Sequence, residues 1–84
     1  MRVIGEINHP SCKISIFYMN QKYIVKVEKD TYEQTYKLSE FDYLIKDVED
    51  LKKLINEDFI QKCLNSFIKM RETNNIAFES ISLG

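Results

Sequence analysis

The amino-acid sequence predicts an α+β fold: a four-stranded antiparallel β-meander of order 1-2-3-4, with one face covered by a C-terminal kinked helix or two consecutive helices. Near Ser39 the spacing of apolar residues changes from period two, typical of strands, to roughly period 3.6, typical of helices. The strand part is rich in Val, Ile, Tyr and Thr. With 84 residues, 44% of them hydrophobic, the chain has the size and composition of one globular domain. We expect the sheet over about 2–38, the helical part over about 40–72 and a cap over 75–84.

The second and third strands form the clearest hairpin, between Cys12 and Glu28. A two-residue turn at Asn20-Gln21 sets Met19 opposite Lys22. Counting outwards gives the pairs Tyr18 with Tyr23, Ile16 with Val25, and Ile14 with Val27. A shift of one residue would send the apolar residues of one strand to the other face, so this pattern favours the register.

The first and fourth strands extend the meander on either side. A four-residue turn over 8–11 would pair Val3, Gly5 and Ile7 with Ile16, Ile14 and Cys12, and a two-residue turn near Asp30-Thr31 would begin the fourth strand. Gly5 inside a strand indicates a bulge or a close approach by the helix. The expected inner face consists of Val3, Ile7, Ile14, Ile16, Tyr18, Tyr23, Val25, Val27, Tyr36 and Leu38.

The helical half has two candidate starts, a capping-box spacing from Ser39 to Asp42 and a second one from Asp47 to Asp50. Its apolar residues form two stripes, which indicates either one helix whose covered face rotates or two helices. The first stripe consists of Val48, Leu51, Ile55, Phe59 and Cys63, and the second, about a quarter-turn or more around the helix, of Ile60, Leu64, Phe67 and Ile68. We favour a break at Asn56, because Asn is a good N-cap and the acidic pair behind it suits a helix N-terminus. An end at Asn74-Asn75 is expected. Residues 76–83 could form a strand, extend the helix or dock over Phe17 and Ile24.

The sequence contains no motif with a specific chemical meaning. His9 and Cys12 bring a base and a nucleophile together, but no third, orienting group accompanies them. We therefore favour a proline-containing turn followed by a small buried residue as the explanation of the pair. A single His and two distant Cys do not make a metal site. With Gly5 and Gly84 as the only glycines, there is no phosphate-binding loop. We therefore expect no enzymatic activity, no cofactor and no metal.

The outer sheet face is the predicted functional surface. Its apolar cluster, the predicted interaction patch, consists of Ile4, Phe17, Met19 and Ile24. Contiguous exposed apolar residues indicate a covering partner, so we expect a small structural or protein-interaction module, a homodimer that uses this face or a sheet edge. The alternative is single-stranded nucleic-acid binding, in which bases stack on Phe17 and lysines follow the backbone. Those lysines are Lys13, Lys22, Lys26 and Lys37.

Composition narrows the partners and the compartment. No apolar run approaches the length of a signal peptide core or of a membrane span, so neither is expected. Two cysteines without an export signal indicate reduced thiols and a cytoplasmic protein. The net charge is −1, and the basic residues form no cluster of the kind that binds duplex nucleic acid.

Overall fold

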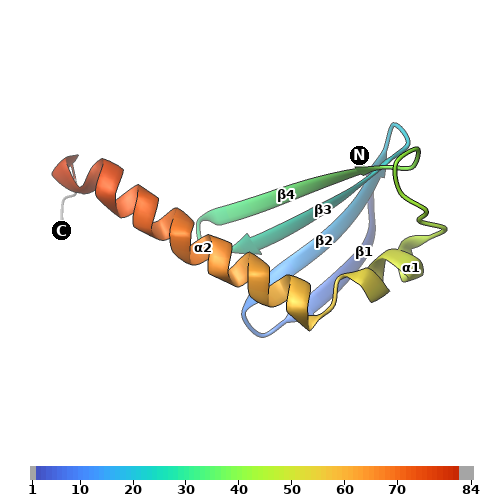
Figure 1. Cartoon of the computed structure of the whole chain (residues 1–84), viewed down its shortest axis with the longest axis horizontal. Helices are drawn as coiled ribbons and strands as arrows, with labels where there is room; N and C mark the ends of the chain where they lie inside the picture. Colours follow the sequence, from blue (N-terminus) through green and yellow to red (C-terminus); the bar gives the residue numbers. More distant parts are fainter. Residues whose placement is uncertain (1, 82–84) are drawn as a thin grey trace.

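The protein is described by a computed structural model that covers residues 2–81. Four eight-residue strands form one antiparallel sheet of order β1-β2-β3-β4: β1 (Arg2–His9), β2 (Cys12–Met19), β3 (Lys22–Lys29) and β4 (Tyr32–Ser39). Helices α1 (Val48–Leu54) and α2 (Glu57–Phe78) follow, and a short 3-10 turn, η1 (Glu79–Ile81), extends α2 (Figure 1). The predicted α+β meander is confirmed.

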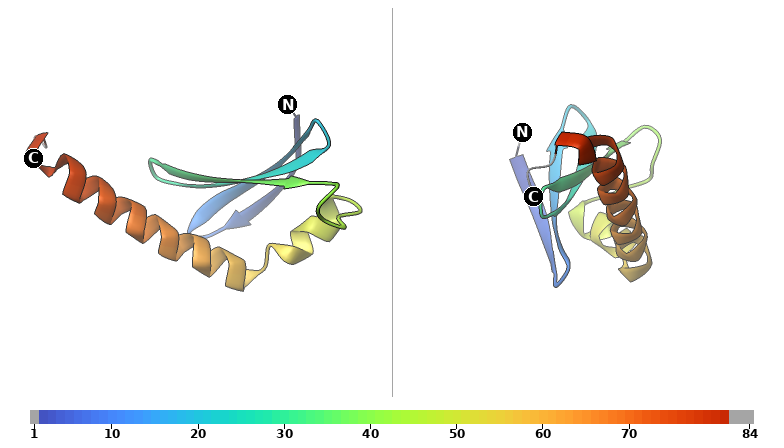
Figure 2. Two further views of the ribbon diagram at one scale, coloured as in Figure 1. Left: turned by 45° about the horizontal axis from the view of Figure 1, so that its top comes forward. Right: turned by 90° about the vertical axis from the view of Figure 1, so that its left-hand side faces the viewer.

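Both helices lie on the same face of the sheet, and no helix or strand of residues 2–81 covers the other (Figure 2). The core forms between the inner face and the helices. Leu51 of α1 and Phe67 of α2 are 1% and 4% exposed, and they belong to the same core cluster as the fully buried Ile14 and Ile16 of β2. Burying an aliphatic or aromatic side chain of this size contributes about 1.5–3 kcal/mol, so this layer is the main source of stability.

The predicted β2–β3 register is confirmed pair for pair, from Met19 opposite Lys22 to Ile14 opposite Val27. Asn20 and Gln21 form the turn with φ values of 52° and 62°. Positive φ at both central residues defines the hairpin turn whose twist matches the strands. The turn at Asp30-Thr31 is also confirmed, and it sets Lys29 opposite Tyr32.

The predicted β1–β2 register is wrong by two residues. The turn consists of Pro10 and Ser11 alone, so Ile7 faces Ile14 and Gly5 faces Ile16. A bulge between Val3 and Gly5 then changes the faces of the residues beside it. Val3, expected inside, pairs with Phe17 on the outer face and is 48% exposed. Ile4, expected outside, packs against the core.

Gly5 combines the two roles predicted for it, because it adjoins the bulge and α1 also approaches it closely. A Cβ atom at this position would lie 2.8 Å from Cγ2 of Val48 and 3.2 Å from Cε of Lys52. The side chains of α1 therefore occupy the space that a larger residue in β1 would need.

The break between the helices is confirmed at Asn56, whose side chain accepts a hydrogen bond from the Phe59 N–H at 3.0 Å. Helix α1 begins after Asp47, which accepts from the Asp50 N–H at 2.9 Å. The expected helix start near residue 40 is wrong. There the Ser39 hydroxyl accepts from a backbone N–H at 3.2 Å within a turn, and residues 40–47 form a loop.

The expected helix end at Asn74-Asn75 is also wrong, since α2 passes through both residues to Phe78. No Gly or Pro lies between Glu57 and Ile81, so nothing in the sequence stops the helix. Of the alternatives for residues 76–83, helix extension holds up to residue 81, and residues 82 and 83 lie outside the described part.

The C-terminal end of α2 extends beyond the end of the sheet (Figure 1). We call residues 71–81 the α2 overhang; it begins at Arg71, whose guanidinium still lies 3.6 Å from a carboxylate oxygen of Asp30 in the β3–β4 turn. None of the overhang side chains that the structure describes is buried. The molecule is correspondingly elongated. Its radius of gyration is 15.0 Å, whereas about 12 Å is typical of a compact domain of this length.

Candidate interaction surfaces

The outer face holds only part of the predicted interaction patch. Phe17 and Ile24 lie opposite each other there, as the register requires. Ile24 is only 6% exposed, so neighbouring side chains of the sheet cover it. Met19 is 41% exposed beside the β2–β3 turn, and Ile4 is absent from this face. Val3 takes the place of Ile4 on this face, opposite Phe17, so its most exposed apolar side chains are Val3 and Met19.

The four predicted nucleic-acid contacts do share the outer face, according to the strand register. Three glutamates lie among them. The face carries Lys13, Lys22, Lys26 and Lys37 together with Glu6, Glu28 and Glu33. The Lys26 ammonium lies 5.5 Å from the centre of the Phe17 ring and 3.8 Å from a carboxylate oxygen of Glu33. The one aromatic ring available for base stacking is thus already in contact with a cation.

His9 and Cys12 are cross-strand neighbours beside the β1–β2 turn. Nδ1 of His9 accepts from the Ser11 N–H at 3.1 Å, so Nε2 carries the proton and donates to Glu57 at 3.2 Å. Hydrogen bonds from Gln61 and then from His9 lower the pKa of the Glu57 carboxyl. Burial raises the pKa of the Cys12 thiol, which is opposite to the shift that activates a nucleophilic cysteine. This cluster ties the turn to the start of α2.

A partly buried polar contact joins β4 to the middle of α2. The amide of Gln34 donates to the Cys63 carbonyl at 2.8 Å, and the Tyr36 hydroxyl donates to the Gln34 side-chain oxygen. Burial, followed by the contact with the Cys63 sulfur, raises the pKa of Tyr36 to about 12. Tyr36 also packs edge-on against Phe59, with 5.5 Å between ring centres. These contacts hold α2 on β4.

Two apolar hollows flank β4 on the helical side of the sheet. The first, which we call the α1 hollow, measures about 260 Å³ and lies between β4, the loop 40–47 and both helices. Leu38 lines it, and Leu44 is 99% exposed at its rim. The second, the overhang hollow, measures about 370 Å³ and lies between the start of β4 and α2, with Tyr32 and Phe78 in its lining.

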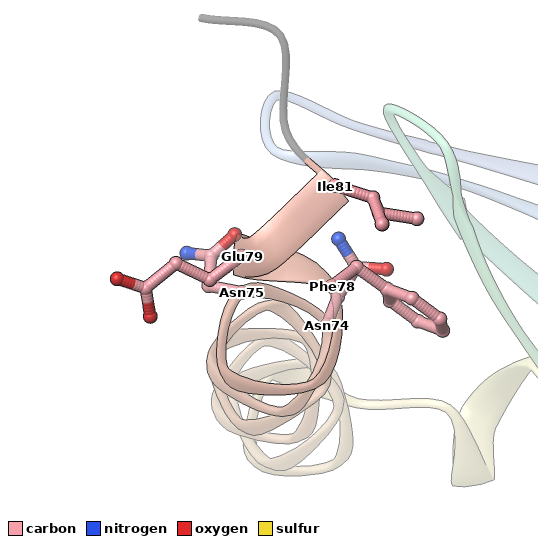
Figure 3. A pocket seen from close by; sticks show the side chains of 5 residues that line it. All are labelled: Asn74, Asn75, Phe78, Glu79 and Ile81. Atoms are coloured by element: carbon pink, nitrogen blue, oxygen red, sulfur yellow. The ribbon is translucent and has the colours of Figure 1, made fainter.

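The α2 overhang continues the stripe that packs on the sheet. Phe78 lies eighteen residues after the buried Ile60, which is five full helical turns, so both face the same side. Phe78 is 54% exposed and Ile81 is 71% exposed. Figure 3 shows these two side chains on one side of the helix end, with Glu79 on the other. The sequence analysis noted residues 76–83 but offered docking over Phe17 and Ile24 as their apolar contact. It did not place Phe78 on the stripe of Ile60, although the spacing between these two residues is the signal that could have done so.

The comparisons add no relative: family models, curated proteins and solved structures all give no match to this chain. Among residues 2–81, no three His, Cys, Asp or Glu side chains gather in a way that could hold a metal ion. Within the same range, no helix is both long and apolar enough to cross a membrane.

Proposed function

We propose that this protein is a small non-catalytic interaction module that forms a homodimer through the β4 side of its helical layer. The observation that carries the proposal is the apolar stripe of α2, which continues to Phe78 and Ile81, where the two side chains are 54% and 71% exposed beside the overhang hollow. The adjoining hollows supply further apolar surface beside an edge strand. Contiguous apolar surface of this kind is typical of protein–protein contacts.

A second copy of the chain is the partner that fits these features. Each copy offers a projecting apolar helix end and an apolar hollow at the opposite end of β4. In a two-fold dimer every contact occurs twice, so a projection on one copy can fill a hollow on the other and the reverse. A domain of 84 residues also gains stability readily from self-association.

Sedimentation over a micromolar concentration range tests the proposal, with Phe78→Ser and a matched control, Ile76→Ser. Ile76 is 78% exposed but lies sixteen residues after Ile60, and so faces nearly the opposite side of the helix. Burying the exposed half of Phe78 in both copies is worth about 2 kcal/mol, so Phe78→Ser should weaken the dimer roughly thirtyfold. The control should leave it unchanged. A wild-type protein that stays monomeric would refute the proposal.

A further inference from the structure

The two edges of the sheet differ in their capacity to pair with another strand. The β1 edge carries the bulge between Val3 and Gly5, and bulges at edges hinder further strand pairing. Strand β4 pairs with β3 without interruption from Tyr32 to Ser39. Among residues 2–81, β3 is the only strand that pairs with β4, so the other side of β4 is a regular edge with no strand bonded to it.

The backbone groups that face this edge follow from the hairpin geometry. A two-residue turn closes on a hydrogen-bonded pair, here Lys29 with Tyr32, and bonded pairs then alternate along the strands. The Glu40 N–H donates to the Gln21 carbonyl at 3.0 Å, and Gln21 with Glu40 is one of the pairs that this alternation makes hydrogen-bonded. Even-numbered residues of β4 therefore bond to β3. The N–H and C=O groups of Glu33, Thr35 and Lys37 point outwards.

From this geometry we infer that two copies pair through β4 as antiparallel strands, with the two-fold axis at Thr35, so that both sheets become one. The inference rests on the proposed self-association and specifies its interface. With Thr35 opposite its own copy, Glu33 lies opposite Lys37 of the second copy, and the same contact recurs across the axis. Opposite charges at directly facing strand positions stabilise the pairing. Registers centred on Glu33 or Lys37 would instead set like charges opposite each other.

The inner-face residues of the same register support it. Tyr32 of one copy lies opposite Leu38 of the other, and Gln34 lies opposite Tyr36. Tyr32 lines the overhang hollow and Leu38 lines the α1 hollow. The overhang hollow of each copy therefore adjoins the α1 hollow of the other, which brings Phe78 to apolar surface of the second copy.

Charge reversal tests the register, with the dimer dissociation constant measured by sedimentation. Lys37→Glu sets two acidic groups opposite each other at both symmetric positions, and we expect it to weaken the dimer about tenfold. The double variant E33K/K37E restores opposite charges and should return the constant to within about threefold of wild type. Lys22→Glu is the matched control, because it makes the same change on the outer face of the inner strand β3. It should have no effect.

Thr35→Pro provides an independent test. The Thr35 N–H points away from β3, and proline is tolerated on an edge strand where its missing N–H would face solvent. We expect the variant to keep its circular dichroism spectrum and to lose the dimer by more than a hundredfold. A dimer that survives Thr35→Pro, or one that E33K/K37E fails to restore after Lys37→Glu weakens it, would overturn the inferred interface while leaving self-association standing. A monomeric wild type would refute the proposed function itself.

Discussion

Gly5→Ala provides the sharpest test of how α1 sits on the sheet. The added methyl would lie 2.8 Å from Cγ2 of Val48, closer than carbon atoms approach without displacement. Overpacking of this kind lowers the free energy of unfolding by about 1–3 kcal/mol. Alanine also reduces the conformational entropy of the unfolded chain, which offsets about 0.4–1 kcal/mol of that loss. A net loss of roughly 1–2 kcal/mol remains, which corresponds to roughly 5–15 °C in melting temperature for a domain of this size.

Val48→Ala supplies the matched partner for a double-mutant cycle. It removes the methyl groups that the new side chain would meet, at a cost of about 1 kcal/mol when made alone, because Val48 is only half-buried. In the double variant the two changes compensate. We therefore expect its loss of stability to be about 1 kcal/mol smaller than the sum of the losses in the two single variants.

Urea denaturation followed by circular dichroism measures all four proteins, with an unchanged m value as the check on two-state unfolding. The proposed dimerisation would raise apparent stability, so one protein concentration is used throughout. A Gly5→Ala protein as stable as wild type, or single-variant effects that simply add, would contradict the close approach of Val48 to β1.

Two further predictions concern pH and nucleic acid. The pKa of Tyr36 is about 12 in the folded protein against 10.0 ordinarily. The stabilisation that this shift reports is therefore fully present below pH 10, and the free energy of unfolding falls as pH rises from 10 towards 12. Tyr36→Phe should flatten this alkaline decline in urea midpoints, and an equally steep decline would disprove the assignment. Because acidic groups lie among the outer lysines, we expect no oligonucleotide binding at low salt. Salt-sensitive binding that is lost when Lys22 and Lys26 are both replaced by Ala would instead establish the alternative function.

Where local pattern and tertiary packing agreed, the sequence was sufficient. The β2–β3 register follows from Asn20-Gln21 and from the alternation on either side, because a slip would expose the apolar residues. The break at Asn56 follows from its capping side chain. The β1 register did not follow in the same way. A four-residue turn over 8–11 fits the same alternation, and the bulge beside Gly5 changes which face Val3 and Ile4 occupy.

The candidate site was harder to predict for a related reason. Outer-face exposure was inferred from alternation alone, whereas sheet side chains cover Ile24 and the bulge turns Ile4 inwards. Phe78 has the period of a buried residue, and only the position where the sheet ends leaves it exposed. Periodicity reports which side of an element a residue faces, and it carries no information about how far the neighbouring element extends.

The sequence by itself determined the class of fold, the strand order, the central hairpin and the capped break between the helices. Each of these depends on interactions between residues close in the chain. Tertiary structure alone decided the bulge in β1, the length by which α2 outruns the sheet and the choice of β4 as the regular edge. Those features depend on how α1 and α2 meet strands far away in the sequence, which no local pattern records.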